Sequence, residues 1–369
     1  MVIAASLLQS VGRGGHCWFL GQWLLGLRRL GWSVFFLDYE DETRPATEHE
    51  RLQLAEVLRI FDVQDSYAVL TPTGSSAGKS RADALDVVRR SRGLVNVMGY
   101  VRDPAVLEAA PVRIFLDIDP GYGQMWRELG LADVLAGHDT FVTVAGNMGH
   151  PSCTVPDAGA SWTTVSPPVV LARWPATPGG EAFTTVATWR GPWGPVEYDG
   201  RTYGSRVHEF RKFAPLPARA GALCELALDI HGDEATDIAL LHRGGWTLVD
   251  PQAVAAHPNT YRRYIQRSRG EICVAKNMYV DTRCGWISDR SVCYLASGKP
   301  VLAQDTGFQR TVPTGTGLVP FTTLDEAVAG MQDIEARYDV HSAAARELAS
   351  EYFDSDVVLP ALLEETGVA

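Results

Sequence analysis

The chain has 369 residues, which is enough for roughly two domains of about 150 residues each. Hydrophobic residues make up 46% and charged residues 21%, so the chain can bury a sizeable core and does not belong to the disordered class. The net charge of -11 argues against a protein that binds nucleic acid through a broad basic face.

The first half of the chain predicts strands that alternate with helices. An apolar strand at 2–8, a glycine-rich turn at 11–16, a helix at 17–30 and a strand at 33–37 form a βαβ unit. Further strands are predicted at 67–70, 94–99, 112–118 and 140–144, and helices at 52–61 and 82–90. Residues 150–181 are rich in Pro, Gly, Ser and Thr, which is typical of a linker.

A second alternation begins at residue 183. Strands are predicted at 183–188, 223–230, 246–250, 271–275, 300–304 and 317–321. Helices are predicted near 206–214, 252–268, 289–297, 323–337, 341–353 and 354–365. Two such runs predict an α/β protein with two doubly wound, Rossmann-like domains that face each other across a cleft.

The glycine-rich turn after the first strand is a candidate ligand-binding loop. Gly14 and Gly15 allow the backbone to approach a ligand closely. His16 stands at the start of the first helix, where it faces the expected cleft and titrates near neutral pH. We expect His16 to act as a general base, although a lone histidine can also simply line or cap a helix start.

Two carboxylates end the predicted strand at 112–118. Asp117 and Asp119 point to the same side if the strand continues that far. Asp119 is a candidate for orienting His16 in catalysis, and Asp117 for binding an acceptor. The alternative is a local turn in which Asp119 bonds the backbone around Pro120.

The segment 283–291 is the strongest candidate for binding a diphosphate. A helix is predicted to begin beside a glycine turn, where free backbone N–H groups and the helix dipole favour an anion. The candidate diphosphate-binding residues here are Arg283, Gly285, Ser288, Asp289, Arg290 and Ser291. The alternative is a helix that is only capped by Ser288 or Asp289, with a solvated Arg290.

Further donor-binding candidates lie at the ends of neighbouring strands. Lys276 follows the strand at 271–275, and Asp305, Thr306 and Gly307 follow the strand at 300–304. A carboxylate such as Asp305 can accept hydrogen bonds from vicinal sugar hydroxyls, although Asp-Thr-Gly is also a common turn. Basic residues after the strand at 183–188 are candidates for the opposite wall, namely Arg190, Arg206, Arg211 and Lys212.

One segment nearly matches a nucleoside-triphosphate-binding loop. Residues 73–80 read Thr-Gly-Ser-Ser-Ala-Gly-Lys-Ser, but the motif needs glycine where Thr73 stands, and Gly74 is one residue too close. We therefore expect a loop on the acceptor side here.

The stretch Arg283-Cys-Gly-Trp-Ile-Ser288 resembles the His-Cys-Gly-Trp-Asn-Ser stretch of the family 1 nucleotide-sugar transferases, which have the GT-B fold. Arg283, Ile287 and Ser291 depart from that family, which has His, Asn and Glu at these positions. Lys276 resembles the lysine that retaining GT-B enzymes use near this strand, but their Glu-x7-Glu signature is absent.

The resemblance implies a metal-independent hexosyltransferase of bacterial secondary metabolism. The donor would be a nucleoside-diphosphate sugar, expected to carry UDP, dTDP or GDP, and the acceptor a small natural product or amino sugar. No further cofactor is implied. A sugar-nucleotide epimerase or phosphorylase on the same fold, and a non-catalytic sugar-binding relative or partner protein, remain alternatives.

The resemblance also predicts a domain layout. Residues 1–165 would bind the acceptor, 166–182 would link the domains, 183–350 would bind the donor, and 351–369 would form a helix that crosses back to the first domain. Six scattered cysteines without a Cys-x-x-Cys pair favour reduced thiols. No signal peptide or membrane span is recognised. We therefore expect a cytoplasmic monomer or homodimer.

Overall fold

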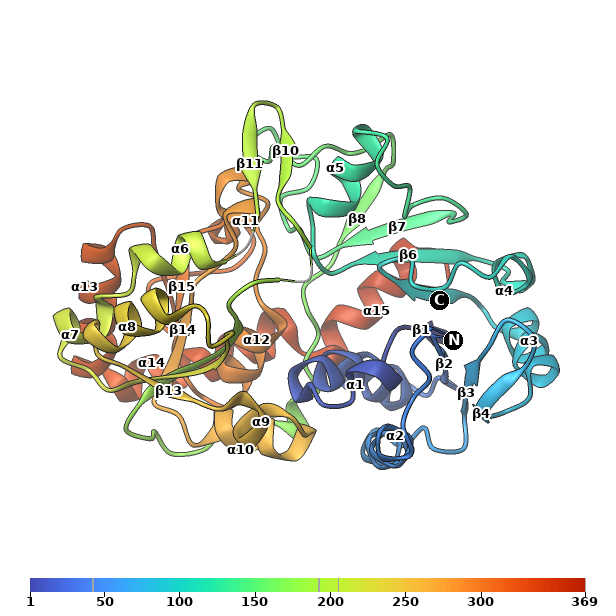
Figure 1. Cartoon of the computed structure of the whole chain (residues 1–369), viewed down its shortest axis with the longest axis horizontal. Helices are drawn as coiled ribbons and strands as arrows, with labels where there is room; N and C mark the ends of the chain where they lie inside the picture. The colour runs from blue at the N-terminus through green and yellow to red at the C-terminus, as the bar shows by residue number, and fades with distance from the viewer. Residues whose placement is uncertain (42, 192, 205, 369) are drawn as a thin grey trace.

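The computed structural model describes residues 1–41, 43–191, 193–204 and 206–368. Two sheets with helices on their faces lie side by side, one from each half of the chain (Figure 1). Helices α1, α12 and α15 lie between them in this view. Among the described residues, no helix is both long enough and apolar enough to cross a membrane.

The first sheet has the strand order β4-β3-β2-β1-β5-β6-β7-β8 over the described residues. Its neighbours are parallel, except that β3 and β4 are antiparallel. The strands are β1 (Val2–Ala4), β2 (Phe35–Tyr39), β3 (Tyr67–Leu70), β4 (Ser75–Gly78), β5 (Leu94–Val97), β6 (Arg113–Asp117), β7 (Thr140–Thr143) and β8 (Trp162–Thr164). The helices are α1 (Gly14–Arg29), α2 (Glu48–Ile60), α3 (Arg81–Arg90), α4 (Pro104–Ala109) and α5 (Tyr122–Glu128).

The second sheet is parallel throughout, with the order β13-β12-β9-β14-β15-β16 over the described residues. Its strands are β9 (Phe183–Thr188), β12 (Cys224–Asp229), β13 (Trp246–Val249), β14 (Gly270–Cys273), β15 (Val301–Gln304) and β16 (Leu318–Phe321). Its helices are α6 (Val207–Lys212), α7 (Leu216–Ala220), α8 (Ala235–Arg243), α9 (Pro251–Ala255), α10 (Pro258–Gln266), α11 (Asn277–Thr282), α12 (Asp289–Ala296), α13 (Leu324–Ala336) and α14 (Tyr338–Leu348).

The loop between β1 and α1 is held in place by a buried carboxylate of the neighbouring strand. The backbone N–H groups of Leu7 and Leu8 donate to Asp38 Oδ2 at 2.9 and 2.7 Å. The predicted strand at 2–8 therefore ends at Ala4, because the chain turns to reach Asp38. Burial raises the pKa of Asp38 to about 6. This anchor fixes where the glycine-rich turn and α1 begin.

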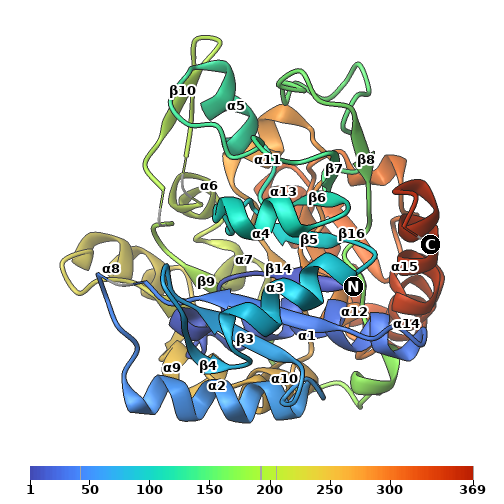
Figure 2. The same ribbon diagram turned by 90° about the vertical axis from the view of Figure 1, so that its right-hand side faces the viewer.

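A β-hairpin of the second half reaches over to the first half. Strands β10 (Val196–Tyr198) and β11 (Arg201–Tyr203) are joined by Asp199 and Gly200, whose φ angles of 48° and 70° are those of a tight two-residue turn. The hairpin lies beside α5 in both views (Figures 1 and 2). This hairpin was not predicted from the sequence.

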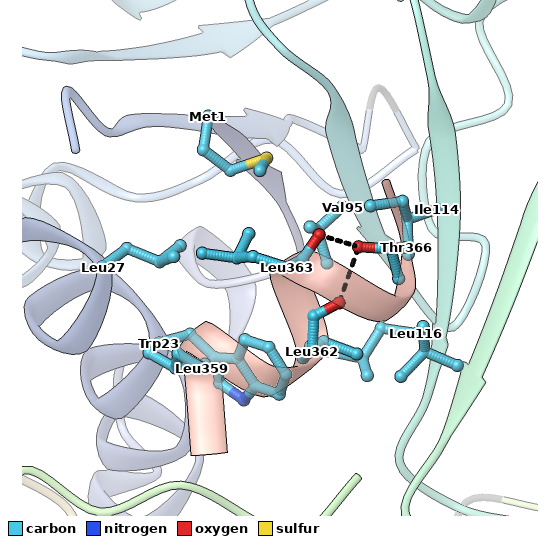
Figure 3. Close-up of a pocket in the computed structure, with 11 residues that line it drawn as sticks. Met1, Trp23, Leu27, Val95, Ile114, Leu116, Leu359, Leu362, Leu363 and Thr366 are labelled. Carbon is cyan, nitrogen blue, oxygen red and sulfur yellow. Dashed lines mark hydrogen bonds between the residues drawn. The ribbon is translucent and has the colours of Figure 1, made fainter. Parts of the chain in front are cut away.

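The last helix, α15 (Ser355–Glu365), lies against α1 and the first sheet. Gly26 of α1 allows the close approach, since a Cβ there would lie 2.6 Å from Leu359 Cδ1. The two helices and the sheet enclose an apolar gap of about 20 Å³, lined by residues that include Met1, Trp23 and Leu362 (Figure 3). Ala369, at the end of the predicted crossing segment, lies outside the described residues.

Three local predictions differ from the structure. Residues 252–268 form two helices, because Pro258 disfavours helical geometry at His257, whose φ and ψ are -106° and 145°. The helix predicted at 341–353 begins at Tyr338, and its last turn, Ala349–Phe353, is a π-helix. The segment that resembles a phosphate-binding loop instead forms the edge strand β4, paired with β3, and its Ser80 caps α3.

Candidate functional site

Two cavities meet between the two halves of the chain. The first, here called the cationic cavity, has a volume of about 290 Å³, and the second, here called the apolar cavity, has about 230 Å³. His16 and Asp289 line both. The two side chains thus stand where a group could pass from one cavity to the other.

The cationic cavity lies where parallel α/β sheets usually bind ligands. In the second sheet, β9 is followed by β12 on one side and lies beside β14 on the other, so the strand order reverses at β9. Such a switch point opens a crevice at the carboxyl ends of the strands. Residues 186–188 at the end of β9 and Asp229 at the end of β12 line the cavity, together with Gly12, Arg13, Gly15 and His16 of the first half.

This cavity is lined by three arginines, Arg13, Arg206 and Arg290, and by two carboxylates, Asp229 and Asp289, so basic side chains outnumber acidic ones. Arg290 is fixed by its surroundings. Its Nε donates to the buried Glu271 at 2.5 Å, and a terminal nitrogen donates to the carbonyl of Val186 at 2.9 Å. The positive end of this side chain is therefore largely balanced by Glu271.

Arg206 has no such balance among the described residues. Its Nε is buried without a hydrogen-bond partner, and it forms no ion pair with a described carboxylate. Burial, followed by the nearby charge of Arg290, lowers the pKa of Arg206. A half-buried guanidinium with an unpartnered Nε, beside a second guanidinium, favours an anion in the cavity, because the anion would supply a hydrogen-bond acceptor and a counter-charge.

The start of α12 lies at the junction of the cavities, but a residue of the chain already accepts a hydrogen bond from one of its free backbone N–H groups. The Ser288 hydroxyl caps the helix by accepting from Arg290 N–H at 3.2 Å. The Asp289 side chain lines both cavities, and burial raises its pKa. Ser291 is buried, and its hydroxyl finds no partner among the described residues. Of the predicted residues in this helix, Asp289 and Arg290 line the cationic cavity, whereas Ser288 and Ser291 do not.

His16 is oriented by a backbone carbonyl. Its Nε2 lies 2.5 Å from the carbonyl oxygen of Ser6. A carbonyl only accepts, so Nε2 carries the proton and Nδ1 of the neutral ring keeps a free lone pair. Burial lowers the pKa of His16, which favours this neutral form at pH 7. The ring is therefore set to accept a proton.

The carboxylates predicted to assist His16 have other partners. Asp119 pairs with Lys276 of the second half at 2.6 and 2.8 Å and also accepts from the hydroxyl of Tyr279. Asp117 is buried, accepts from Gln124 and Thr143 at 2.7 and 2.9 Å, and has its pKa raised to about 6 by burial. Here the structure differs from the prediction, since the carbonyl of Ser6 occupies the role expected of Asp119.

The turns predicted to bind the sugar and phosphates pack against one asparagine of the first half. Asn147 Nδ2 donates to the carbonyls of Arg283 and Gly307 at 2.9 and 3.0 Å. Gly285 and Gly307 have φ angles of 78° and 92°, and a Cβ on either would lie under 3 Å from Asn147. These glycines therefore serve close contact between the domains.

Asp305, Thr306 and Arg283, which were also predicted to bind the donor, lie in the same contact between the domains. Asp305 accepts from Gly307 N–H at 2.7 Å, and the Thr306 hydroxyl donates to the carbonyl of Trp286 at 2.7 Å. The Arg283 side chain is half exposed and lies 3.4 Å from Asp305. None of these residues lines the cationic cavity. The structure thus separates them from the arginines that do.

The remaining predicted residues also fall into two groups, those that line the cationic cavity and those that do not. Arg190 and Lys212 are exposed and pair with Glu234 and Glu209. Gly15 lines the cationic cavity, whereas Gly14 is packed against the carbonyls of α9 and the residue before α10. Of the four basic candidates after β9, only Arg206 lines the cavity, and no local sequence pattern distinguishes it from the other three.

Several residues that line the cavity were not predicted from the sequence, among them Arg13, Asp229 and Tyr261. Arg13 directly precedes α1, beside the glycines that were singled out, so its position in the loop could have raised it as a candidate. Asp229 is the last residue of β12, as Asp117 is of β6. Tyr261 lies in helix α10, and no motif in the neighbouring sequence marks it as a residue that lines a cavity.

Known proteins match this chain in structure. No protein-family model and no curated protein sequence matches it. HepE from Anabaena, solved in complex with UDP-glucose, has a TM-score of 0.60 at 12% identity, with 100% of this chain and 99% of HepE covered. AviGT4, a glycosyltransferase involved in avilamycin A biosynthesis, has a TM-score of 0.58 at 15% identity, with coverage of 99% and 96%.

A third match is the sucrose-phosphate synthase from Thermosynechococcus elongatus, with a TM-score of 0.55 at 12% identity and coverage of 99% and 98%. These similarities cover nearly the whole of each chain. They therefore include both sheets and the last helix, α15. With two doubly wound α/β domains facing each other across the cavities at His16, the chain has the GT-B fold of these glycosyltransferases.

Proposed function

We propose that the protein transfers a hexosyl group from a UDP-sugar to a hydroxyl of a small acceptor, without a metal ion. The observation that carries this proposal is the meeting of a cationic and an apolar cavity at a neutral histidine. The choice of UDP as the first donor to test rests on HepE, which was solved with UDP-glucose.

In this proposal the donor diphosphate lies in the cationic cavity beside Arg206, with Arg13 and Arg290 around it. The guanidinium of Arg206, whose Nε is buried, would gain an ion-pair partner that it lacks among the described residues. The carboxylate of Asp229 is placed to accept hydrogen bonds from donor hydroxyls. Asp289, an anion at the junction, would face the sugar hydroxyls and not the phosphates, because like charges repel.

The chemistry follows from these positions. Nδ1 of His16 accepts the proton of the acceptor hydroxyl while the acceptor oxygen forms a bond to the anomeric carbon. The bond between that carbon and the diphosphate oxygen breaks, and UDP leaves with its electron pair. The guanidinium groups stabilise the charge that develops on the leaving diphosphate.

Metal independence is also a proposal, and it rests on the partners of the one Asp-x-Asp pair. Asp119 is engaged by Lys276 and Tyr279, and Asp117 by Gln124 and Thr143. These contacts occupy the carboxylate oxygens that a divalent cation would need. Cations of the protein itself line the proposed diphosphate site.

Calorimetric titration with UDP, dTDP, GDP and ADP tests the proposal. UDP should bind the wild-type protein, and Arg206→Met should weaken it by about 10- to 100-fold, because a charge-assisted hydrogen bond contributes about 1.5–3 kcal/mol. Arg190→Met is the matched control, since Arg190 is exposed and paired with Glu234, and it should leave the affinity unchanged.

Release of UDP from UDP-glucose in the presence of acceptors then tests turnover. The proposal fails if none of the four nucleotides binds, or if Arg206→Met and Arg190→Met have the same effect. It also fails if His16→Gln releases UDP at the wild-type rate in the presence of an acceptor.

A further inference from the structure

A chain of hydrogen bonds connects a buried carboxylate to His16 through a single peptide group. The peptide group between Ser6 and Leu7 donates its N–H to Asp38 Oδ2 at 2.9 Å, and its carbonyl oxygen lies 2.5 Å from His16 Nε2. This peptide is trans, and a planar trans peptide points its N–H and its carbonyl in opposite directions. The bond to Asp38 on one side therefore aims the carbonyl of Ser6 at His16 on the other.

The carboxylate of Asp38 is itself surrounded by donors. Its Oδ2 also accepts from Leu8 N–H at 2.7 Å, and its Oδ1 accepts from Tyr39 N–H at 2.7 Å and lies 3.0 Å from the hydroxyl of Tyr100. The side chain is fully buried, which raises its pKa to about 6 and still leaves it ionised at pH 7. Only an ionised carboxylate accepts hydrogen bonds at both ends. An amide of the same size would turn an NH₂ group toward one of these donors.

The charge of Asp38 acts on His16 as well as its position. A hydrogen bond from a peptide N–H to a carboxylate polarises the peptide group, so that its carbonyl oxygen becomes a stronger acceptor. The carbonyl of Ser6 then holds the proton on Nε2 and stabilises the positive ring that forms when Nδ1 takes a second proton. A carboxylate in direct contact with a histidine base has the same two effects. No carboxylate of the described residues forms a hydrogen bond or an ion pair with the ring of His16 itself.

We propose that Asp38 is a positioning residue for His16, and that it acts through the peptide group between Ser6 and Leu7. Its role in turnover rests on the proposed function, whereas the hydrogen-bond chain can be tested without substrate. During the reaction Nδ1 takes the proton of the acceptor hydroxyl, Nε2 keeps its own proton, and Asp38 keeps its charge. No proton crosses the peptide group. The chain thus does the work that was expected of Asp119.

Nuclear magnetic resonance of protein with isotope-labelled histidine tests the hydrogen-bond chain. At pH 7 the wild-type protein should show a slowly exchanging Nε2–H signal that is missing from His16→Gln. Asp38→Asn should lose this signal, because the amide cannot accept from all of its neighbours and the peptide group loses its fixed direction. Asp117→Asn is the matched control and should keep the signal, since Asp117 is also buried at the end of a strand of the first sheet but accepts from Gln124 and Thr143.

Binding and turnover separate positioning from general damage to the protein. Release of UDP from UDP-glucose is measured with 4-methylumbelliferone and with glucosamine as acceptor probes. Asp38→Asn should lower kcat at least tenfold, because a positioned general base contributes about 10²–10⁴-fold. It should leave the affinity for UDP within about threefold of the wild type, because Asp38 does not line the cationic cavity. A variant that was only destabilised would lose kcat and UDP binding together.

The possible outcomes distinguish the inference from the proposed function. A wild-type protein without a protected Nε2–H on His16 overturns the inference, and this result does not depend on whether a variant folds. A signal that survives Asp38→Asn, or that Asp117→Asn also removes, overturns it as well. If UDP binds and Asp38→Asn keeps the wild-type kcat, the positioning role is wrong and the glycosyl transfer stands. If no nucleotide binds, the proposed function is wrong and the role of Asp38 in turnover fails with it.

Discussion

The ion pair between Asp119 and Lys276 tests most directly whether these two residues stabilise the domain contact or act in catalysis and donor binding. Asp119 was expected to act in catalysis and Lys276 to bind the donor, but their side chains, 22% and 17% exposed, pair with each other across the domains. We predict that this pair stabilises the contact between the domains and does not bind the diphosphate.

The size of the effect follows from the geometry. At the separation of 2.6 Å between Lys276 Nζ and Asp119 Oδ2, an effective dielectric constant of about 20 gives roughly 6 kcal/mol of attraction. Desolvation and side-chain entropy offset most of this. Exposed pairs contribute about 0.2–1 kcal/mol, and removal of one partner of a buried pair costs about 3–5 kcal/mol. A mostly buried pair should therefore show a coupling energy of about 1–2 kcal/mol.

A double-mutant cycle measures that coupling. The free energies of unfolding in urea are compared for the wild type, Asp119→Asn, Lys276→Met and the double variant. The double variant should lose about 1–2 kcal/mol less than the sum of the two single losses, and all four proteins should bind UDP within about threefold of one another. A coupling below about 0.3 kcal/mol, together with a tenfold or greater loss of UDP affinity in Lys276→Met, would refute the reasoning and return Lys276 to the donor site.

Three further predictions concern the base, the returning helix and the domain contact. Because burial lowers the pKa of His16, its basic form prevails above that pKa, so kcat/KM should rise with pH along a limb centred below about 6.5, and a limb centred higher contradicts the assignment. Leu359→Ala should lower the free energy of unfolding in urea by about 2–5 kcal/mol, against less than about 0.5 kcal/mol for the exposed Val357→Ala. Gly285→Ala should lower the melting temperature more than Gly31→Ala, because both have positive φ but only Gly285 also meets the opposite domain; equal losses would show that the contact is not tight.

The architecture was predictable because its strands are short, apolar and regularly spaced. The strands predicted at 67–70 and 183–188 are observed with those bounds. Elements whose signals are weaker were missed. The hairpin of β10 and β11 carries an Asp-Gly turn at 199–200 that is a recognised hairpin signal, but it lies in a segment that was treated only as a source of basic residues. Helix α11 was missed because its six residues are too few to show a period.

The site was harder to predict, because local sequence does not reveal which domain surface faces which. Gly285 and Gly307 look like ligand-binding glycines in sequence, since both take positive φ and allow a close approach. The approaching group is Asn147, which is more than 130 residues away in the chain. The same glycine conformation serves a phosphate or a neighbouring domain equally well, so only the tertiary structure distinguishes the two.

The same argument applies to the helix start at Ser288. A helix N-terminus attracts anions, but here the protein has already placed an anion there, since Asp289 is the first residue of α12. The dipole that was expected to hold a phosphate therefore acts in part on a carboxylate of the chain. The uncompensated positive charge lies instead on Arg206, which stands on the opposite wall, after β9. If the diphosphate binds by charge, Arg206→Met must weaken UDP more than Ser288→Ala does, because removing the cap costs the helix only about 1 kcal/mol and leaves the guanidinium groups in place.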